Sequence, residues 1–339
     1  MSLKVAMHQE ITIFQELAPE WDELLHRSVT DVIFLTVEWQ STWWESYHAG
    51  ELLIFTCRDE EDRLLGIAPW FIHDIRGERV VRTIGCVDVT DYVDVIVDKA
   101  FLQPVLACFA AVLNENSARF DRVNFCNIPE ASPTLSVFPD LLRSCGFEVD
   151  LILQEVCPVI SLPSTWDEYL ESLDKKQRHE IRRKLRRAES EVDLEIEALT
   201  EAADVNASID TFLNLMASSQ PAKAEFLQNA GNARFFRSIV QAAAERGWLR
   251  MSFLKVNGDP VAAYCDFIYQ GKVLVYNSGL LIDKYAHLST GIVLLAQNIR
   301  WAIENGHRVF DFLRGNETYK YRMGGRDTRV FKLMARKSH

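Results

Sequence analysis

The sequence lacks the long apolar runs that a membrane-spanning helix requires. Runs such as Val293–Ala296 fall far short of the ~20 apolar residues needed to cross a bilayer. The N-terminus continues from Met1 into polar residues and shows no apolar signal core. We therefore expect no membrane insertion and a cytoplasmic location.

Paired cysteines and low-complexity segments are also missing. The seven cysteines are scattered, odd in number and contain no Cys-x-x-Cys pair, which argues against a disulfide framework or a zinc site. Glycine and proline, 15 and 10 residues, are too few for a fibrous or disordered chain. What remains is a 339-residue globular chain with 48% hydrophobic residues, long enough for about two domains.

Positive charge is scarce except in one segment. Lys175–Arg187 holds eight Lys and Arg residues against Glu180 alone, whereas the whole chain carries a net charge of −11. This balance argues against a DNA-binding protein, but one basic helix can bind a single anionic ligand. We expect Arg178 and Arg182 to clamp a phosphorylated or carboxylated acceptor. The alternatives are a solvated helix surface or contact with RNA phosphates.

Hydrophobic periodicity predicts an α/β protein whose two halves repeat one order of strands and helices. Pro158 and Pro163 mark a linker, so we place the domains at residues 1–157 and 158–339. The turn and strand at 62–72 resemble those at 258–268, and the helix end and strand at 112–125 resemble those at 302–312. A duplicated domain explains this pattern, although any two α/β domains share such units.

A polar loop between an apolar strand and a helix gives the strongest candidate site. The strand at 273–279 is followed by Ser289, Thr290 and Gly291 at the start of the helix 292–305. Free N–H groups and the dipole at a helix start suit a phosphate, and Gly291 would allow close approach. An ordinary N-cap is the alternative reading.

The segment that follows resembles two related families. Asn316, Tyr321 and Gly324 are similar in order to a motif of GNAT acetyltransferases, with a shorter Asn–Tyr spacing than usual. The run from Asp311 to Gly315, followed by Tyr319-Lys320, resembles the C-terminal signature of Fem-type and CelD-type transferases. The basic helix and the segments Phe34–Trp39 and Asp88–Asp94 resemble other parts of these families. The chain is thus identified as a CelD-type double-GNAT protein: two tandem GNAT-like domains, each a mixed, mostly antiparallel sheet flanked by helices.

This resemblance implies an acyl-CoA donor, such as acetyl-CoA, and assigns roles to the C-terminal residues. The pyrophosphate is expected at Ser289–Gly291, with His287 nearby, and Tyr321 or Tyr319 is expected to protonate the leaving thiolate. Lys320 would stabilise the oxyanion or bind substrate. Two sets complete the site: donor-binding backbone at Asn277, Ser278 and Gly279, and substrate-binding side chains at Asp311 and Arg314. The last two residues could instead form a structural pair.

An acidic run in the N-terminal half supplies the expected acceptor side. Asp88, Asp91 and Asp94 surround Tyr92 in a segment where carboxylates could attract a cationic amine. Resemblance to double-domain relatives supports Asp91 as a base, with Asp88, Tyr92 and Asp94 binding substrate. Turn-forming aspartates on a solvated strand are the alternative, and no familiar metal set is completed here.

Together these features predict an acyltransferase that moves an acyl group from acyl-CoA to an amine or hydroxyl. The acceptor is expected to be a small molecule, with a sugar or polysaccharide precursor as one candidate, and no metal is expected. One alternative is a Fem-type aminoacyl or peptidyl transferase that uses charged tRNA. Another is a non-catalytic double-GNAT scaffold, because fold alone does not fix function.

Overall fold

The chain forms two units in the computed structural model, which describes residues 2–86, 89–282 and 285–338. Unit 1 comprises Met1–Val156 together with Thr328–His339, and unit 2 comprises Cys157–Asp327. The sequence places the boundary at nearly the same residue, 157. The last twelve residues, however, lie in unit 1 instead of the second domain.

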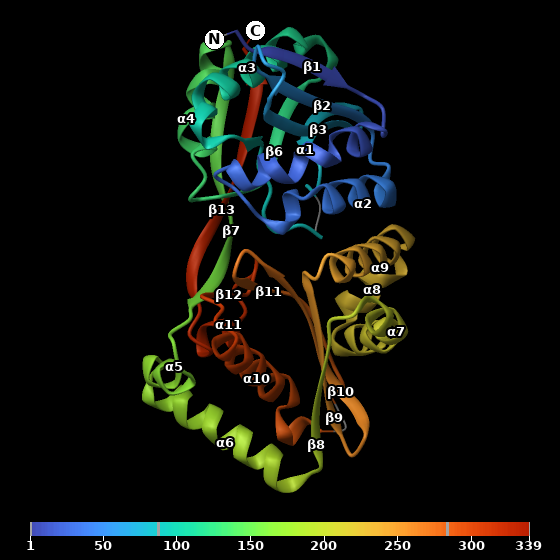
Figure 1. Ribbon diagram of the computed structural model, residues 1–339, viewed down its shortest axis with the longest axis vertical. Helices are drawn as coiled ribbons and strands as arrows, with labels where there is room; N and C mark the ends of the chain where they lie inside the picture. The colour runs from blue at the N-terminus through green and yellow to red at the C-terminus, as the bar shows by residue number, and fades with distance from the viewer. Residues whose placement is uncertain (1, 87–88, 283–284, 339) are drawn as a thin grey trace. The chain divides into compact units, whose positions relative to one another are not determined.

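Unit 1 has one mixed sheet with helices against it (Figure 1). Its elements are β1 (Lys4–His8), α1 (Ile13–Arg27), α2 (Val37–Tyr47), β2 (Glu51–Arg58), β3 (Leu64–Ile75), β4 (Glu78–Thr83), β5 (Ile96–Val97), α3 (Leu102–Glu115), β6 (Arg122–Pro129), α4 (Thr134–Ser144), the first part of β7 (Phe147–Ser161) and most of β13 (Arg326–Lys337). The strand order is β1-β2-β3-β4-β6-β13-β7. Strands β4 and β6 are parallel, and the pairs β1–β2, β2–β3, β3–β4 and β6–β13 are antiparallel.

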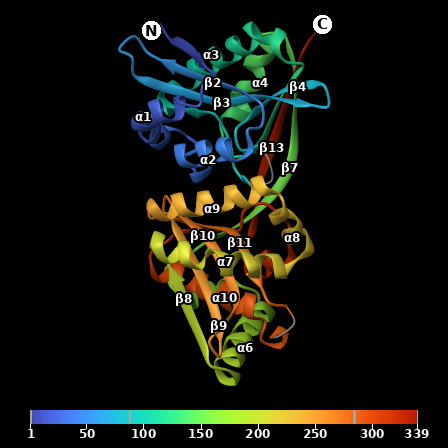
Figure 2. The same cartoon turned by 90° about the vertical axis from the view of Figure 1, so that its right-hand side faces the viewer.

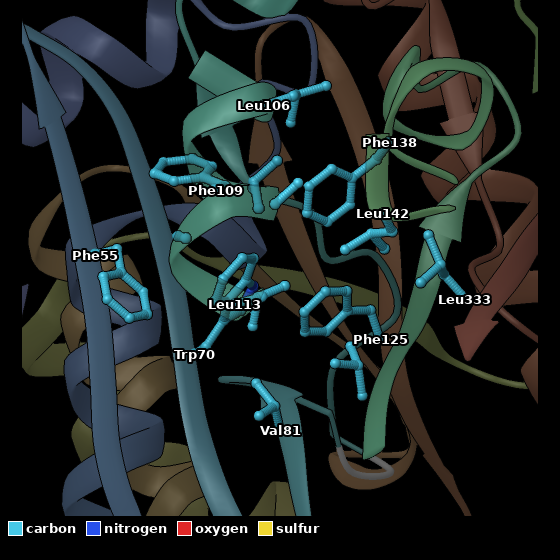
Figure 3. Packing of buried hydrophobic residues seen from close by; sticks show 14 of the residues in the cluster. Phe55, Trp70, Val81, Leu106, Phe109, Leu113, Phe125, Phe138, Leu142 and Leu333 are labelled. Carbon is cyan, nitrogen blue, oxygen red and sulfur yellow. The ribbon is translucent and has the colours of Figure 1, made fainter. Parts of the chain in front are cut away.

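The core of unit 1 lies between this sheet and the helices α3 and α4, and it is rich in aromatic rings (Figure 3). The ring of Trp70 stacks on Phe125 with centroids 4.9 Å apart, and Phe109 meets Trp70 edge-on. Leu333 of β13 is fully buried in the same cluster. The final strand therefore completes the N-terminal unit.

Unit 2 repeats the order of unit 1 after two additional helices. Its elements are α5 (Trp166–Ser172), α6 (Lys175–Glu191), β8 (Leu194–Leu199), α7 (Ala202–Ser219), α8 (Pro221–Gln228), α9 (Ala230–Glu245), β9 (Leu249–Val256), β10 (Asp259–Tyr269), β11 (Lys272–Leu280), α10 (Thr290–Glu304), β12 (Val309–Asp311) and α11 (Thr318–Arg322). The strand order is β7-β12-β11-β10-β9-β8, with β11 and β12 parallel. The expected fold class, two tandem GNAT-like domains, is confirmed.

Helices cover both faces of the unit 2 sheet. Helices α10, α5 and α6 lie on one face, and α7, α8 and α9 lie on the other (Figures 1 and 2). The basic helix α6 is separate from α5, because the chain leaves helical geometry at Leu173 and Asp174. Asp174 then caps α6 by accepting a hydrogen bond from Gln177 N at 3.0 Å.

The segment after β4 differs most from the sequence prediction. Within the described residues of this segment, Ile96 and Val97 form β5 and pair with β3. Asp94, expected to bind substrate or, alternatively, to lie on a solvated strand, is buried. Cys86 and Cys126 form a disulfide with Cα atoms 5.9 Å apart, whereas the sequence predicted no disulfide framework. The two cysteines are 40 residues apart, so only the fold reveals their proximity.

Two negative findings apply to the part of the chain that the structure describes. Within it, no helix is both long and apolar enough to cross a membrane. The same residues contain no group of three His, Cys, Asp or Glu side chains placed to hold a metal ion.

Candidate active site

The candidate site begins where β11 separates from β12. The two strands pair only at Lys272–Leu274 and Val309–Asp311, although β11 continues to Leu280. A register shift between Cys265 and Asp266 of β10 marks a β-bulge opposite Val275–Asn277 of β11. Among the described residues, no further β12 partner is found along Val275–Leu280. We call this stretch, which among these residues has no strand beside it on the β12 side, the free edge of β11.

A tight turn follows β12 and is held by a buried lysine. Asp311 accepts a hydrogen bond from Leu313 N at 2.8 Å, and Leu313 has a φ of 57°. Lys320 is 2% exposed, and its Nζ donates to the carbonyls of Leu313, Arg314 and Gly315 at 3.3, 2.7 and 3.2 Å. Glu317 Oε2 lies 2.9 Å from the same nitrogen. These contacts occupy the ammonium and favour a role for Lys320 in shaping the turn.

The start of α10 is held by the basic helix. Ser289 precedes the helix with a φ of 55°, a left-handed conformation that costs energy for a non-glycine residue. Lys184 of α6 donates from Nζ to Ser289 Oγ at 2.9 Å. The N–H groups of Thr290 and Gly291, at the helix start, have no acceptor within the helix. Helix N-termini of this kind bind anions.

A cavity of about 310 Å³ lies between α6, α11 and the first turn of α10. Its lining consists of Lys176, Gln177, Glu180, Ile181, Lys184, Ile292, Tyr319, Arg322 and Met323. Three cations against one carboxylate give this lining a positive charge. Burial lowers the pKa of Lys184, which shows that its ammonium is partly withdrawn from water.

The face of α6 at the cavity is not the one that the sequence analysis selected. Lys176, Glu180 and Lys184 recur every four residues and share the cavity face. Arg178 and Arg182, expected to bind the acceptor, do not line the cavity, and Arg182 is exposed. The apolar positions Ile181 and Ala188 were the available signal, because their burial fixes which side of the helix turns inward.

The two expected tyrosines lie on different sides of α11. Tyr319 lines the cavity and meets Phe312 edge-on with ring centroids 6.0 Å apart. Burial, with Glu317 and Asp266 nearby, raises the pKa of Tyr319 well above its usual value. Tyr321 is exposed, and its hydroxyl donates to Asp327 at 2.8 Å. Tyr319 is therefore the tyrosine that a ligand in the cavity can reach.

The remaining expected donor-binding residues have different surroundings. Asn277 accepts a hydrogen bond from Ser278 N at 2.9 Å. A Cβ added to Gly279 would lie 2.4 Å from Met216 N, so this glycine is required for α7 to pack on β11. At Gly291 the same atom would meet only the flexible Leu280 side chain, at 2.7 Å. His287 is half exposed and lies 3.7 Å from Glu191 at the end of α6.

Sequence reasoning missed a lysine on the opposite face of the sheet. Lys223 of α8 donates from Nζ to the carbonyl oxygen of Ser278 at 2.6 Å and lies 3.4 Å from Ser278 Oγ. Burial lowers the pKa of Lys223 to about 8, and the nearby Glu317 carboxylate opposes this shift. No motif marks this residue, because its position depends on the packing of α8.

A buried polar network joins the same sheet to α10. Asn298 donates to Ser252 at 2.9 Å and to Asp266 at 3.3 Å, and it accepts from Arg250 at 2.9 Å. Arg250 also lies over the ring of Trp301, 4.2 Å from its centroid. Burial raises the pKa of Asp266 to about 7, and Arg250 opposes this shift. The network connects α10 to strands β9 and β10.

The residues that the sequence analysis expected to bind the acceptor belong to unit 1. Asp88 lies outside the described residues. Asp91 is half-buried, and Tyr92 is buried with its ring meeting Phe34 at 5.9 Å. Asp94 accepts hydrogen bonds from Thr30 at 2.7 Å, from Ser132 and from Val95 N at 2.8 Å. Burial raises the pKa of Asp94, although these bonds oppose the shift, and its surroundings are those of a core residue.

Comparisons with known proteins agree with this arrangement. The model of the acetyltransferase (GNAT) domain family matches residues 175–321, which include α6, the free edge of β11, α10 and most of α11. Residues 175–321 are therefore similar to a GNAT domain. The fold of the chain is the Fem-like, double-GNAT fold. No curated protein matches the chain.

Solved structures show the same fold over the whole chain. The crystal structure of FemX has a TM-score of 0.66 at 11% identity, covering 98% of this chain and 97% of FemX. L-PGS from Bacillus licheniformis has a TM-score of 0.56 at 11% identity, covering 95% and 92%. A tandem GNAT protein from the clavulanic acid biosynthesis pathway has a TM-score of 0.50 at 12% identity, covering 100% and 99%. At these identities the likeness concerns the fold.

Proposed function

We propose that this protein transfers an acyl group from an acyl-CoA to an amine or hydroxyl acceptor. The observation that carries this proposal is the bond from Lys184 to Ser289, which brings a cation to the start of α10 beside a positively lined cavity. The phosphates of the donor would lie at this helix start, with Lys176 and Arg322 nearby. The thioester would then lie along the free edge of β11.

Tyr319 suits the proton-transfer step of such a reaction. Attack by the acceptor on the thioester carbon produces a thiolate, which needs a proton as it leaves. The hydroxyl of Tyr319 is protonated at neutral pH, as an ordinary phenol is, so it has a proton to give, although its raised pKa makes it a weaker acid than a free phenol. An acceptor amine must arrive neutral or lose its proton to a base. Asp91 remains our proposal for that base, and a sugar or polysaccharide precursor remains the proposed acceptor.

A matched pair of variants on one helix tests the donor site. Lys184→Ala removes the cation at Ser289, whereas Arg182→Ala removes an exposed cation two residues away. We expect CoA to raise the Tm of the wild type, and Lys184→Ala to weaken CoA binding about tenfold, equal to about 1.4 kcal/mol. Arg182→Ala should bind CoA like the wild type. Equal losses in both variants, or no Tm shift with CoA, would contradict the proposal.

A Fem-type aminoacyl or peptidyl transfer from charged tRNA is the second candidate. The outer surface of α6 favours it, because Arg178, Arg182 and Arg186 remain turned away from the cavity lining. Charged tRNA should then stabilise the protein where CoA does not, and its affinity should fall steeply with salt. Arg182→Ala would weaken tRNA binding, which reverses the order expected for CoA.

A further inference from the structure

The most unusual side chain outside the cavity is Lys223. It lies on α8, on the face of the unit 2 sheet opposite α10 and α6. Its Nζ reaches across to the Ser278 carbonyl at 2.6 Å. That carbonyl lies four residues beyond Leu274, the last β11 residue that pairs with β12. The lysine amine therefore stands directly at the free edge of β11.

Glu317 connects this lysine to the cavity side. Its carboxylate lies close enough to raise the pKa of Lys223 on one face and that of Tyr319 on the other. The same carboxylate contacts Lys320 at 2.9 Å, which fixes the turn after β12. A donor that lies along the free edge of β11 would pass the Lys223 amine at the Ser278 carbonyl.

The Lys223 amine is also more nucleophilic near neutral pH than a surface lysine. Its pKa of about 8 leaves an appreciable neutral fraction at pH 7.5, whereas an ordinary lysine with a pKa near 10.4 has almost none. The bond to Ser278 uses one N–H of the amine and leaves its lone pair free for attack.

We propose that Lys223 is a self-acylation site, which takes the acyl group of a thioester donor when no other acceptor is present. This inference rests on the proposed acyl-CoA donor. The neutral amine attacks the thioester carbonyl carbon, so a C–N bond forms and the C–S bond breaks. The thiolate leaves and takes up one proton, and the amine loses one proton to Glu317 or to water. The products are Nε-acyl-lysine and free CoA, with no oxidant, reductant or metal required.

The experiment incubates the full chain with acetyl-CoA at pH 7.5 and measures acetylation at each lysine by peptide mass spectrometry. We expect Lys223 to be acetylated at least tenfold faster than Lys4, Lys175 and Lys332, which serve as internal references. Excess CoA should suppress acetylation at Lys223, because it occupies the donor site, and leave the references unchanged. When acetyl phosphate, which lacks the nucleotide, is the acetyl donor, CoA should not suppress acetylation of the reference lysines.

Two controls separate this inference from the proposed function. Lys223→Arg keeps the positive charge and should remove the fast acetylation while still giving a Tm shift with CoA. If CoA raises the Tm of the wild type but Lys223 is acetylated no faster than the references, or without suppression by CoA, self-acylation is refuted and acyl-CoA binding stands. If CoA gives neither a Tm shift nor protection, both proposals fail.

Discussion

The two units share one order of elements but use the space after their fourth strand differently. In unit 2 the edge of β11 beyond Leu274 is free, and a cavity lies at the start of α10. In unit 1 the segment after β4 lies against β6, because Val93 N donates to Asn127 O at 3.0 Å. Thr90 and Val93 are fully buried in this segment. In unit 1 the chain itself covers the position that corresponds to the open strand edge of unit 2.

This difference shows how one fold can support either packing or chemistry. Buried aromatic and β-branched side chains stabilise unit 1, whereas the edge left open in unit 2 leaves backbone groups for a ligand. The acidic segment, a candidate acceptor site by sequence, contributes Asp94 to a buried hydrogen-bond cluster. The predictions below test each side of the comparison, from the largest effect to the smallest.

Loss of the buried side chain at Leu333 should have the largest effect. Leu333→Ala should lower the free energy of unfolding of unit 1 by about 2–5 kcal/mol, because it leaves a cavity in the core of Figure 3. Hydrogen exchange should increase along β6, with little change along β10. Lys332→Ala, on the partly exposed side of the same strand, is the control. Faster exchange confined to β10 would mean that the C-terminal strand supports unit 2 instead.

Asp266 should make the stability of unit 2 depend on pH. The pKa of Asp266 in the folded protein, about 7, lies above its ordinary value of 3.8. The folded state therefore retains a proton between these pH values, and the free energy of unfolding falls as pH rises through this window. Asp266→Asn removes the titration. Relative to wild type, the variant should gain up to about 4 kcal/mol between pH 4 and pH 8. Parallel stability curves for the two proteins over this range would show that Asp266 is ionised throughout.

Gly279 at the end of β11 and Gly291 in the first turn of α10 should respond differently to substitution by alanine. Gly279→Ala should cost about 1–3 kcal/mol, because its Cβ would collide with the α7 backbone at Met216. Gly291→Ala should cost less, since Leu280 can move aside. Denaturant unfolding measures both. A larger loss at Gly291 would indicate that the first turn of α10 is more tightly packed than the β11–α7 contact.

The smallest effect should come from Thr90 in the filled segment of unit 1. Its hydroxyl accepts from Trp39 Nε1 at 3.0 Å, and Thr90→Val leaves this buried N–H without its acceptor. We expect a loss of about 1–3 kcal/mol in unfolding free energy with unchanged CoA affinity. Reduced CoA affinity in this variant would show that the segment after β4 contributes to the donor site.

Much of the fold could be predicted because its signals are local. Trp39 and Trp43 are four residues apart and therefore share one helix face, and both side chains are fully buried. The repeated order of strands and helices predicted a duplicated domain, and the resemblance of the segment Asp311–Gly325 to family motifs pointed to GNAT-like domains and to α11. Tyr319 lines the cavity, whereas Tyr321, two residues further along α11, is exposed.

Other parts of the candidate site were beyond sequence reasoning. Lys320 stands in the family-like motif, yet only the folded turn shows its Nζ bound to three carbonyls. Lys223 has no motif and becomes notable only because α8 places it at Ser278. Arg178 and Lys184 are equivalent as cations in a basic helix, and the docking of α6 on α10 decides which of them reaches the loop.

The sequence by itself determined the order of elements and the likeness of residues 175–321 to a GNAT domain, because periodicity, caps and short motifs involve residues within a few turns of one another. Tertiary structure decided which cations face the cavity, which glycine is structural and which unit receives the final strand. Those outcomes depend on packing between segments far apart in the chain, where burial and hydrogen-bond satisfaction select one arrangement among several that the local pattern allows.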